Sequence, residues 1–591
     1  MTLGVFCYSL IILMEKALEH LRHSLAHLLG AAVLELYPDS KLAIGPSIDD
    51  GFYYDIDITD KISDTDLPKI EEKMHELLKT WKTFEGREVA ASEAKKIFKD
   101  NPYKLELISE LEKKGEKITL YTSGHFTDLC RGGHVENVKE IKPNAFKLSR
   151  IAGAYWRGDE KNPQLTRIYG LAFATKDELQ KHLTMLEEAK KRDHKKLGPE
   201  LDLFTFSDLV GGGLPLWTPK GTLLRNLLDD FVWELRKKYG YQQVDIPHIT
   251  KKELYEKSGH WDKFKDELFL IKTREGHEFA MKPMNCPHHT QIYARKPHSY
   301  RELPQRYANT TKVYRDEQSG ELSGLSRVRS ITQDDAHVFC RNNQVKEEIE
   351  KIWDIITGFY KAFGFELSIR LSLHDPKHQE KYLGSPETWE RSEDQLRQVV
   401  KDNKAKSEEA IGEAAFYGPK IDFIGKDSLG RQWQIATIQL DMNMPEKFDL
   451  NCINEKGEKE RIVMIHAAIM GSIERFLSVI IEHYAGAFPV WLSPVQAIIL
   501  PISDTQNEWA KKAYGQLQET GIRVELNKDN ETLSKKIREA EKQKIPYILV
   551  IGDKEIEANS IAVRQRGGED LGRMNLKDFT EKIIEEIKNK K

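Results

Sequence analysis

Three residues that can bind a metal lie in three separate stretches of the chain. Cys286 stands in KPMNCP, His337 ends QDDAH, and His466 opens HAAIMGSIERF. One thiolate and two imidazoles form a three-ligand zinc set, which leaves one coordination position open for a substrate. Cysteine is also among the residue types most often buried, so the spacing alone favours a core cysteine and two unrelated histidines over a metal site. The neighbouring residues must decide between these interpretations.

A second group of possible ligands lies near the N-terminus. His23 and His27 are one helical turn apart and share a face of the predicted helix. Cys130 and His134 stand in the glycine-containing segment DLCRGGH. Four such side chains form the usual closed set of a structural zinc site, so the residue types alone predict a zinc ion that stabilises the fold.

A pair of opposite charges stands between Cys286 and His337. On a strand, the alternation of side chains places Arg315 and Glu317 on the same face, and a glycine-containing loop then returns to Arg327. An isolated pair of this kind is usually a surface salt bridge. Its place between two of the possible metal ligands makes it a candidate for chemistry.

The composition is that of a mildly acidic globular protein. Its 591 residues predict three or four domains at roughly 150 residues each. The formal net charge of −4 does not indicate nucleic-acid binding, but it averages over the domains and leaves room for local basic faces. Five cysteines without paired spacing favour a reducing compartment over a disulfide framework. They are Cys7, Cys130, Cys286, Cys340 and Cys452.

The apolar opening of the chain does not have the pattern of an export signal. It lacks a basic start and a small-residue cleavage site, and it is shorter than the ~20 residues that a membrane-spanning helix needs. We therefore expect a cytoplasmic protein without a membrane partner. Met14 could equally be the first translated residue, so the status of the leader stays open.

The elements that must position these residues fall into segments of different rhythm. Residues 15–197 alternate amphipathic helical stretches with short strands and end on a polar helix, a solvated linker from charge alone. In 198–494, strands joined by hairpins predict an antiparallel sheet with helices on one side. The order strand, helix, strand, helix, strand in 495–591 predicts an α/β domain with a parallel core. With 1–14 as an apolar leader, the chain is expected to be an α+β multidomain protein.

Linked motifs resemble the class II aminoacyl-tRNA synthetases. The helix and strand ending at Pro247 are similar to motif 1 of that class, the stretch 314–327 to motif 2, and 471–476 to motif 3. Within the class, KPMNCP together with QDDAH is similar to the threonyl-tRNA synthetase family. The resemblance runs from about Leu21 to Leu571. It implies a class II antiparallel catalytic core in 198–494, an editing domain before it and an anticodon-binding domain after it.

The resemblance assigns roles in ATP-dependent activation of threonine. Arg315 would hold the α-phosphate of ATP and Glu317 the adenine amino group, while Arg327 and Arg475 would hold the outer phosphates together with Mg²⁺. Such roles suit fixed positive charge around a phosphate that is being attacked. The residues that would line the substrate pocket are Gln333, Asp335, Tyr417, Lys420, Gln434 and Gln439.

The same resemblance gives the metal set a purpose. Zn²⁺ on Cys286, His337 and His466 would bind the amino group and the hydroxyl of threonine together, and Asp335 would receive that hydroxyl. An apolar pocket separates threonine from valine by only about a hundredfold, and valine cannot complete the zinc shell. Serine carries the same two groups and lacks one methyl, a difference of roughly 1–3 kcal/mol, so hydrolytic correction of seryl-tRNA is expected.

The N-terminal cluster resembles the editing domain of bacterial threonyl-tRNA synthetases. In that family the site works without metal, whereas a related module in alanyl-tRNA synthetases binds zinc with comparable residues. On the closer match we favour metal-free hydrolysis, in which these side chains position water and the terminal adenosine. The editing residues would be His23, His27, Lys104, Asp128, Cys130 and His134.

Near the C-terminus, the segment 555–568 resembles the strand pair with which the family reads the anticodon. Glu557 and Arg566 match its base-reading positions, although composition alone describes them as surface charges. The implied partners are therefore tRNA(Thr), threonine, ATP and, through motif 1, a second copy of the chain in a homodimer.

The chain departs from the family pattern in three places. His288 replaces a usual glycine and offers a spare imidazole near the metal, and Tyr314 replaces a common histidine. With His23 so near the start, no room is left for the family's ubiquitin-like module. Two alternatives stay open: a neighbouring synthetase for seryl, prolyl or glycyl transfer, and a synthetase-derived RNA-binding protein without catalysis.

Overall fold

The computed structural model describes the backbone of residues 2–591 and the side chains of residues 15–591. The side chains of the predicted leader, 1–14, lie outside the described residues. The described chain divides into two compact units, of which the first ends at Glu187 and the second is Glu188–Lys591. This division falls within helix α5 (Lys176–Arg192), whereas the predicted boundary after Leu197 lies in α6 (His194–Glu200). Among the described residues, no helix combines the length and the apolarity needed to cross a bilayer.

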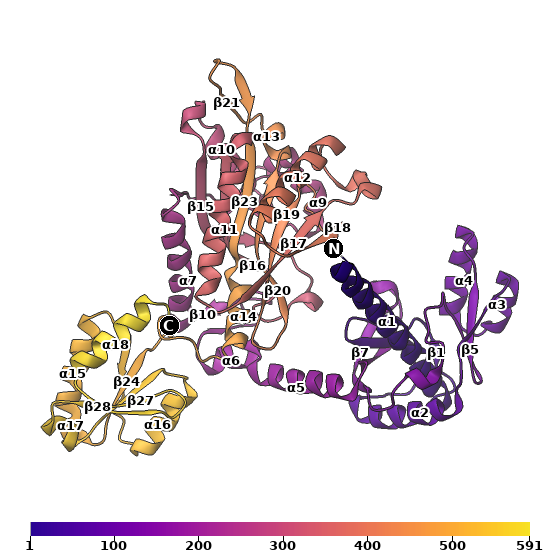
Figure 1. Cartoon of the computed structure of the whole chain (residues 1–591), viewed down its shortest axis with the longest axis horizontal. Coiled ribbons are helices and arrows are strands. Elements are labelled where there is room, and N and C mark those ends of the chain that lie inside the picture. The colour runs from indigo at the N-terminus through magenta and orange to yellow at the C-terminus, as the bar shows by residue number, and fades with distance from the viewer. Residues whose placement is uncertain (1) are drawn as a thin grey trace. The chain divides into compact units, whose positions relative to one another are not determined.

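The first unit packs helices on an antiparallel sheet with strand order β1-β3-β8-β7, in which β2 also pairs with β3, and carries a second sheet, β4-β5-β6 (Figure 1). Its helices are α1 (Thr2–Leu36), α2 (Leu67–Thr80), α3 (Ala91–Ile97) and α4 (Pro102–Lys114). Its strands are β1 (Lys41–Leu42), β2 (Ser47–Ile48), β3 (Gly51–Asp57), β4 (Glu85–Glu88), β5 (Thr119–Ser123), β6 (Phe126–Leu129), β7 (Phe146–Tyr155) and β8 (Gln164–Ala172). One core joins α1 and α2 to the larger sheet through residues such as Leu25, Met74 and Phe52.

The second unit is built on an eight-stranded sheet with the order β11-β15-β16-β23-β20-β19-β17-β18. All its pairs are antiparallel except β11 with β15 and β17 with β18, which confirms the predicted class II type of sheet. The strands are β11 (Gln242–Gln243), β15 (Gln305–Tyr314), β16 (Ser330–Cys340), β17 (Glu366–Leu373), β18 (Ser407–Ile411), β19 (Lys420–Lys426), β20 (Gln432–Asp441) and β23 (Val463–Ser472). The strand predicted at 327–332 begins later, so Arg327 lies in the preceding turn.

Alternation of side chains gives this sheet two different faces. Ala336, Ile438 and Ile465 point into the main core, where α7 (Pro219–Lys237), α11 (Val345–Lys361) and α14 (Ile473–His483) cover the sheet (Figure 1). Their neighbours along the same strands point to the opposite face and carry the polar groups of the site. Smaller elements border the sheet: α8 (Lys252–Ser258), α9 (His260–Phe264), α10 (Cys286–Ala294), α12 (Pro386–Asp402), α13 (Asn443–Lys447), β9 (Phe204–Thr205), β10 (Leu216–Trp217), β12 (Ile249–Lys251), β13 (Leu270–Lys272), β14 (Glu278–Met281), β21 (Asn451–Ile453) and β22 (Lys459–Arg461).

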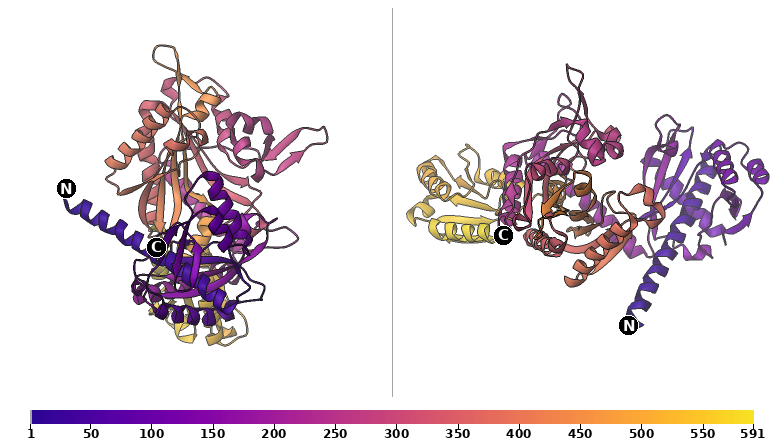
Figure 2. Two further views of the ribbon diagram at one scale, coloured as in Figure 1. Left: turned by 90° about the vertical axis from the view of Figure 1, so that its right-hand side faces the viewer. Right: turned by 90° about the horizontal axis from the view of Figure 1, so that it is seen from above.

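The C-terminal domain has the predicted α/β rhythm. Strands β25 (Val524–Leu526), β24 (Ala497–Pro501) and β26 (Tyr547–Ile551) are parallel, and β27 (Ile561–Gln565) and β28 (Asp570–Met574) extend the sheet in antiparallel pairs. Figure 2 shows this domain in yellow, its sheet flanked by helices. The helices are α15 (Asn507–Glu519), α16 (Leu533–Lys542), α17 (Asp553–Glu557) and α18 (Leu576–Lys588). The prediction of a strand pair in 555–568 is wrong for its first half, because Glu557 is the last residue of helix α17.

Candidate functional site

Cys286, His337 and His466 converge on one buried point. Strands β16 and β23 are neighbours, and their register places His337 directly opposite His466, while Cys286 is the first residue of α10. One possible ligand atom from each residue lies within 4.8 Å of the others, and His337 Nε2 is 3.1 Å from His466 Nδ1. Ligand atoms on a tetrahedral zinc ion are about 3.3–3.8 Å apart, so the three side chains need only small movements to share one ion.

Each histidine of this trio has a second partner on its other ring nitrogen. His466 Nε2 is 2.9 Å from the carboxylate of Asp441, and His337 Nδ1 is 2.8 Å from Nδ1 of His289. The contact of His466 with a carboxylate is the arrangement that metal-binding histidines commonly show, because the second hydrogen bond fixes the tautomer and the orientation of the ring. The donor set and its supports therefore fit a zinc ion.

The charge state of the trio also suits a cation. Burial raises the pKa of the Cys286 thiol well above its usual range, and burial together with His289 and His466 lowers the pKa of His337 well below its own. The imidazole of His337 is therefore neutral and able to ligate. A bound zinc ion would deprotonate the thiol. His288 does not belong to the converging group, and its ring lies edge-on to Tyr255.

Polar side chains surround the trio on the same face of the sheet. The Tyr417 ring stacks on His466 with centroids 5.0 Å apart, and its hydroxyl donates to Gln439. Asp335 accepts a hydrogen bond of 3.1 Å from the Asn285 amide. An acceptor and a hydroxyl group therefore lie close to the metal ligands, where a small polar substrate would meet them.

The buried carboxylate of Asp422 contacts two further predicted pocket residues, Lys420 and Gln434. Asp422 Oδ2 is 2.9 Å from Lys420 Nζ, and Asp422 Oδ1 accepts from Gln434 at 2.7 Å. Ser372 and Thr437 also donate to it. The sequence analysis did not identify Asp422, although its place two residues after Lys420 on a strand puts both side chains on one face.

The loop 315–329 carries three of the predicted phosphate and adenine residues. Glu317 is buried and accepts a hydrogen bond of 2.7 Å from Arg327, which also contacts Glu321 at 3.0 Å. The Arg315 guanidinium lies 5.8 Å from the centre of the Phe264 ring. Arg475, in the first turn of α14, is exposed to solvent.

The start of β16 is held against the end of β23 by residues of both strands. Gln333 lies opposite Ser472, three residues before Arg475, so the register brings the predicted pocket residue close to the first turn of α14. Between Gln333 and Asp335 the pairing shifts, and β23 contains a bulge. The carboxylate of Asp334, which the sequence analysis did not single out, accepts the amides of Ile469 and Met470 at this bulge, at 2.9 and 3.0 Å.

In the first unit, His23, His27, Cys130 and His134 also form one cluster. One ligand atom from each lies within 4.8 Å of the others, and Cys130 Sγ is 3.4 Å from His23 and 3.3 Å from His134. Burial raises the pKa of Cys130 to about 12 and lowers that of His134 to about 2. At neutral pH the cluster therefore contains a thiol and a neutral His134.

Lys104 and Asp128 lie beside this cluster as a buried ion pair of 2.6 Å. The Tyr54 hydroxyl, also buried, donates to the same carboxylate and was not identified from the sequence. A pocket of about 540 Å³ opens on all six predicted residues except His134, and Lys114, Lys117 and Arg131 stand along its lining. Glu19 and Glu110 line the same pocket, so its rim carries charges of both signs, and its volume can admit the end of a nucleic-acid strand.

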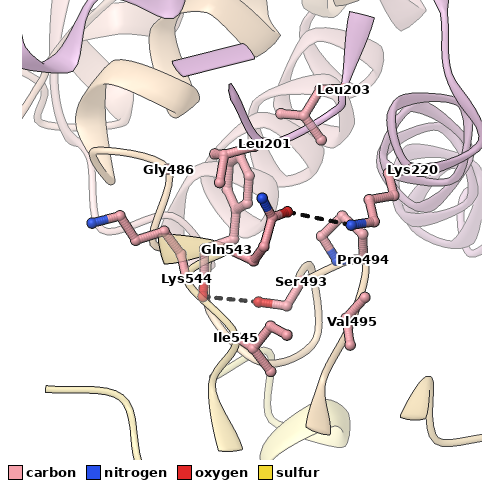
Figure 3. A pocket seen from close by; sticks show the side chains of 11 residues that line it. Leu201, Leu203, Lys220, Gly486, Ser493, Pro494, Val495, Gln543, Lys544 and Ile545 are labelled. Atoms are coloured by element: carbon pink, nitrogen blue, oxygen red, sulfur yellow. Dashed lines mark hydrogen bonds between the residues drawn. The ribbon is translucent and has the colours of Figure 1, made fainter. Parts of the chain in front are cut away.

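The two predicted anticodon residues differ in their surroundings. Glu557 is exposed, and its carboxylate has no hydrogen bond or ion pair with another described residue. Arg566 donates to the carbonyls of Phe488 and Lys544, both at 2.8 Å. These carbonyls border a hollow of about 20 Å³ where Lys220 reaches Gln543 (Figure 3), which is room for about one water molecule.

Family profiles match three segments of the chain. Residues 118–169 match the "Threonyl and Alanyl tRNA synthetase second additional domain", 269–484 the "tRNA synthetase class II core domain (G, H, P, S and T)", and 496–586 the "Anticodon binding domain". Each match falls on a part of the fold that carries one of the three groups of predicted residues.

Relatives align along nearly the whole chain. A threonine–tRNA ligase of Porphyromonas gingivalis is 50% identical over 572 residues, covering 96% of this chain and 87% of its own length. One from Rubrobacter xylanophilus is 49% identical, covering 97% and 89%. The solved RNA binding domain of threonyl-tRNA synthetase from Cryptosporidium parvum has a TM-score of 0.63 and 37% identity, over 66% of this chain and 98% of its own. A prolyl-tRNA synthetase at 17% identity and a TM-score of 0.52, over 67% of this chain and 75% of its own, shares the fold alone.

Proposed function

Because the chain belongs to the threonine–tRNA ligase family of class II aminoacyl-tRNA synthetases, we propose that its clustered residues form an activation site, an editing site and a tRNA-reading surface. The enzyme joins threonine and ATP into threonyl-adenylate, releases pyrophosphate and transfers the threonyl group to the 3′ end of tRNA(Thr). The editing type of N-terminal domain matches the removal of serine from mischarged tRNA.

The activation site is centred on the trio of Cys286, His337 and His466. The single observation that carries this proposal is the convergence of their ligand atoms with Asp441 and His289 behind the two rings. Zinc held by these three residues would act as a Lewis acid that binds the amine and the neighbouring hydroxyl of the substrate. Asp335 accepts a hydrogen bond from the hydroxyl of threonine, a group that valine lacks, so valine leaves a buried acceptor unpaired.

Charged residues around the loop 315–329 position ATP for attack by the threonine carboxylate. Arg315 faces the α-phosphate, and Arg327 and Arg475 face the outer phosphates with Mg²⁺. Glu317 accepts from the adenine amino group. In the structure, Arg327 forms an ion pair with Glu317. We propose that nucleotide binding breaks this pair, so that Glu317 contacts adenine and Arg327 contacts phosphate. Fixed cations of this kind stabilise the charge that develops on the phosphate and on pyrophosphate.

Pyrophosphate exchange together with metal analysis tests the activation site. Valine is expected to be activated at least ~10⁴-fold less well than threonine, because the site hydrogen-bonds the hydroxyl, whereas serine is expected to be only about 10–200-fold worse. His337→Ala should lose zinc and at least about 100-fold of the exchange rate together. Full zinc retention in that variant, or strongest exchange with proline or glycine, would contradict the proposal.

The editing site uses the cluster of the first unit without metal. His23 and His134 approach Cys130 as neutral or weakly basic groups, and Lys104 with Asp128 closes one side of the pocket. These groups position a water molecule against the ester of seryl-tRNA.

Cys130→Ala should let seryl-tRNA accumulate while threonine activation stays unchanged. Unaltered deacylation in this variant would contradict the editing role. One zinc ion bound at this cluster in the purified protein would instead support a structural zinc site.

We further propose that the enzyme is a cytoplasmic homodimer. The basis is the family and motif 1, and sedimentation of the purified protein tests the dimer. Glu557 and Arg566 are proposed to contact anticodon bases of tRNA(Thr). Of the two side chains, that of Glu557 is exposed and has no hydrogen-bond partner among the described residues, so it can accept from a base.

A further inference from the structure

His194 bridges two parts of the catalytic core. It is the first residue of α6, and its Nδ1 and backbone N–H both meet Oε1 of Glu482 on α14, at 2.6 and 3.2 Å. Its second ring nitrogen, Nε2, is 3.0 Å from the backbone N–H of Leu325. Leu325 belongs to the loop 315–329, which we call the ATP loop.

The hydrogen bonds determine which nitrogen carries the proton. Nε2 must accept from the amide of Leu325, so Nδ1 is protonated and donates to Glu482. The other oxygen of Glu482 is held by Arg431 at 2.6 Å. His194 is 4% and Glu482 8% exposed, and a hydrogen bond lost at such depth is costly because no water replaces it.

This cluster is a hydrogen-bonded bridge and not a metal site. Asp193, His194 and Glu482 do bring possible ligand atoms within 4.8 Å of one another. However, both ring nitrogens of His194 and both oxygens of Glu482 already have protein partners. A cation would have to displace the Leu325 amide or the Arg431 guanidinium.

The turn that contacts His194 is fitted closely to its ring. Gly324 has a φ of +50°, and a Cβ atom there would lie 2.3 Å from His194 Nε2. The following residue, Leu325, is fully buried in the main core. Two residues later Arg327 contacts Glu317 and Glu321. The position of this turn therefore sets where Arg327 and Glu317 stand.

We propose that His194 is a positioning residue for ATP. Its ring holds the turn 323–327 against α14, so that the backbone that carries Arg327 is in place before the nucleotide arrives and only the Arg327 and Glu317 side chains need to exchange partners. The inference rests on the proposed ATP site. Because α6 directly follows the linker helix α5, the same residue ties the end of the linker to the ATP loop, and Arg192 supports this end with a hydrogen bond of 3.1 Å to Ser428.

Two substitutions separate the two hydrogen bonds of the ring. In His194→Asn the amide can still donate to Glu482 but does not reach Leu325, whereas in His194→Gln the longer side chain reaches Leu325 as an acceptor. In pyrophosphate exchange, His194→Asn is expected to raise the KM for ATP about tenfold, the equivalent of one buried hydrogen bond, with the KM for threonine unchanged. His194→Gln should recover most of this loss. Gly324→Ala, which displaces the ring, should behave like His194→Asn.

His374→Asn is a matched control. The ring and backbone of His374 meet one oxygen of Glu393 at 2.7 and 3.0 Å, as those of His194 meet Glu482, and its ring has no hydrogen bond to the ATP loop among the described residues. This variant should keep the KM for ATP. If His194→Asn and His194→Gln lose activity equally, or raise both KM values together, His194 has only a structural role and the inference is overturned.

Arg327→Ala distinguishes the role of His194 from the existence of the ATP site. If it raises the KM for ATP and His194→Asn does not, the inference about His194 is wrong while the ATP site stands. If Arg327→Ala leaves the KM for ATP unchanged, the proposed ATP site is wrong and the inference fails with it.

Discussion

Asp441 contacts both the start of a helix and a proposed metal ligand. Its Oδ1 accepts the amides of Asn443 and Met444 and so begins α13, while its Oδ2 holds Nε2 of His466. The His466 ring is thereby turned with Nδ1 toward the other ligands. A carboxylate is needed at this position because both of its oxygens accept hydrogen bonds, one from the two amides and the other from the imidazole N–H of His466.

Asp441→Asn is therefore expected to weaken zinc binding about 10–100-fold. Asparagine can keep the amide contacts of α13, but its NH₂ group cannot accept from His466. A zinc titration against a competing chelator measures the change. Asp354→Asn, at an exposed position, should leave the affinity unaltered, and an equal affinity of the Asp441 variant would contradict the supporting role.

The thiol of Cys130 is expected to be unreactive at physiological pH. Burial raises its pKa to about 12, so the reactive thiolate is far less abundant at pH 8 than for a free cysteine with a pKa near 8.5. Alkylation of Cys130 by iodoacetamide in the native protein should be at least about 100-fold slower than in urea and should accelerate with rising pH. Mass spectrometry of the Cys130 peptide follows both rates. Fast native labelling at pH 7 would show a thiolate instead.

At the scale of elements, the bulge in β23 connects the sheet to the site. Asp334 points into the main-core side of β16, accepts the two bulge amides and lies 3.3 Å from the Arg236 guanidinium of α7. Its neighbour Asp335 points to the opposite face, toward His337. One strand thus carries, side by side, a carboxylate that holds the sheet together and one that faces the proposed activation site.

Asp334→Ala should destabilise the protein by about 3–5 kcal/mol, because it leaves a buried arginine without its carboxylate partner and two amides without an acceptor. Urea denaturation measures the loss. Glu390→Ala, at an exposed position on α12, should stay within about 0.5 kcal/mol of the parent. A comparable stability of both variants would show that water replaces the carboxylate at the bulge.

In the C-terminal domain, helix α17 presents Glu557 at its end while Arg566 is engaged with the chain. Glu557→Gln is expected to raise the KM for tRNA in aminoacylation about tenfold and to leave pyrophosphate exchange unchanged, because activation does not need the anticodon. Arg566→Ala should instead lower the melting temperature as well, since its guanidinium holds the carbonyls of Phe488 and Lys544. Glu557→Gln with normal charging would remove this residue from tRNA recognition.

At the scale of the whole molecule, the two units have separate cores and are joined by α5. Among the described residues of this helix only Leu179 is buried. Chains open most easily where few apolar contacts hold them. The proposed editing and activation sites therefore lie in parts of the chain with separate cores.

Limited trypsin digestion is expected to cut first within α5, for example after Lys181 or Lys190. The fragment that begins after the cut keeps the main core and should retain threonine-dependent exchange, but it should lose deacylation of seryl-tRNA. Gel analysis with both activity assays follows the outcome. Rapid digestion of that fragment to small peptides would show that its stability depends on the first unit.

The sequence by itself determined the class of the protein and the faces of its elements. Local periodicity predicted the alternation of strands and helices in the first half of the C-terminal domain, and the side-chain alternation that puts Lys420 and Asp422 on one face follows from the strand alone. The metal trio and the histidine and cysteine cluster were recognisable because their flanking strings are specific.

Only the tertiary structure decided which of these faces meet. The partners Asp441 and Asp334 depend on strand register and on a bulge, and His194 depends on where α6 touches a turn 131 residues later in the chain. None of these contacts is local, because each arises from packing between elements that are distant in sequence. The physical reason is that the periodicity of a strand or helix determines only which face a side chain lies on. The packing of elements around a common core determines which side chain of another element lies opposite it.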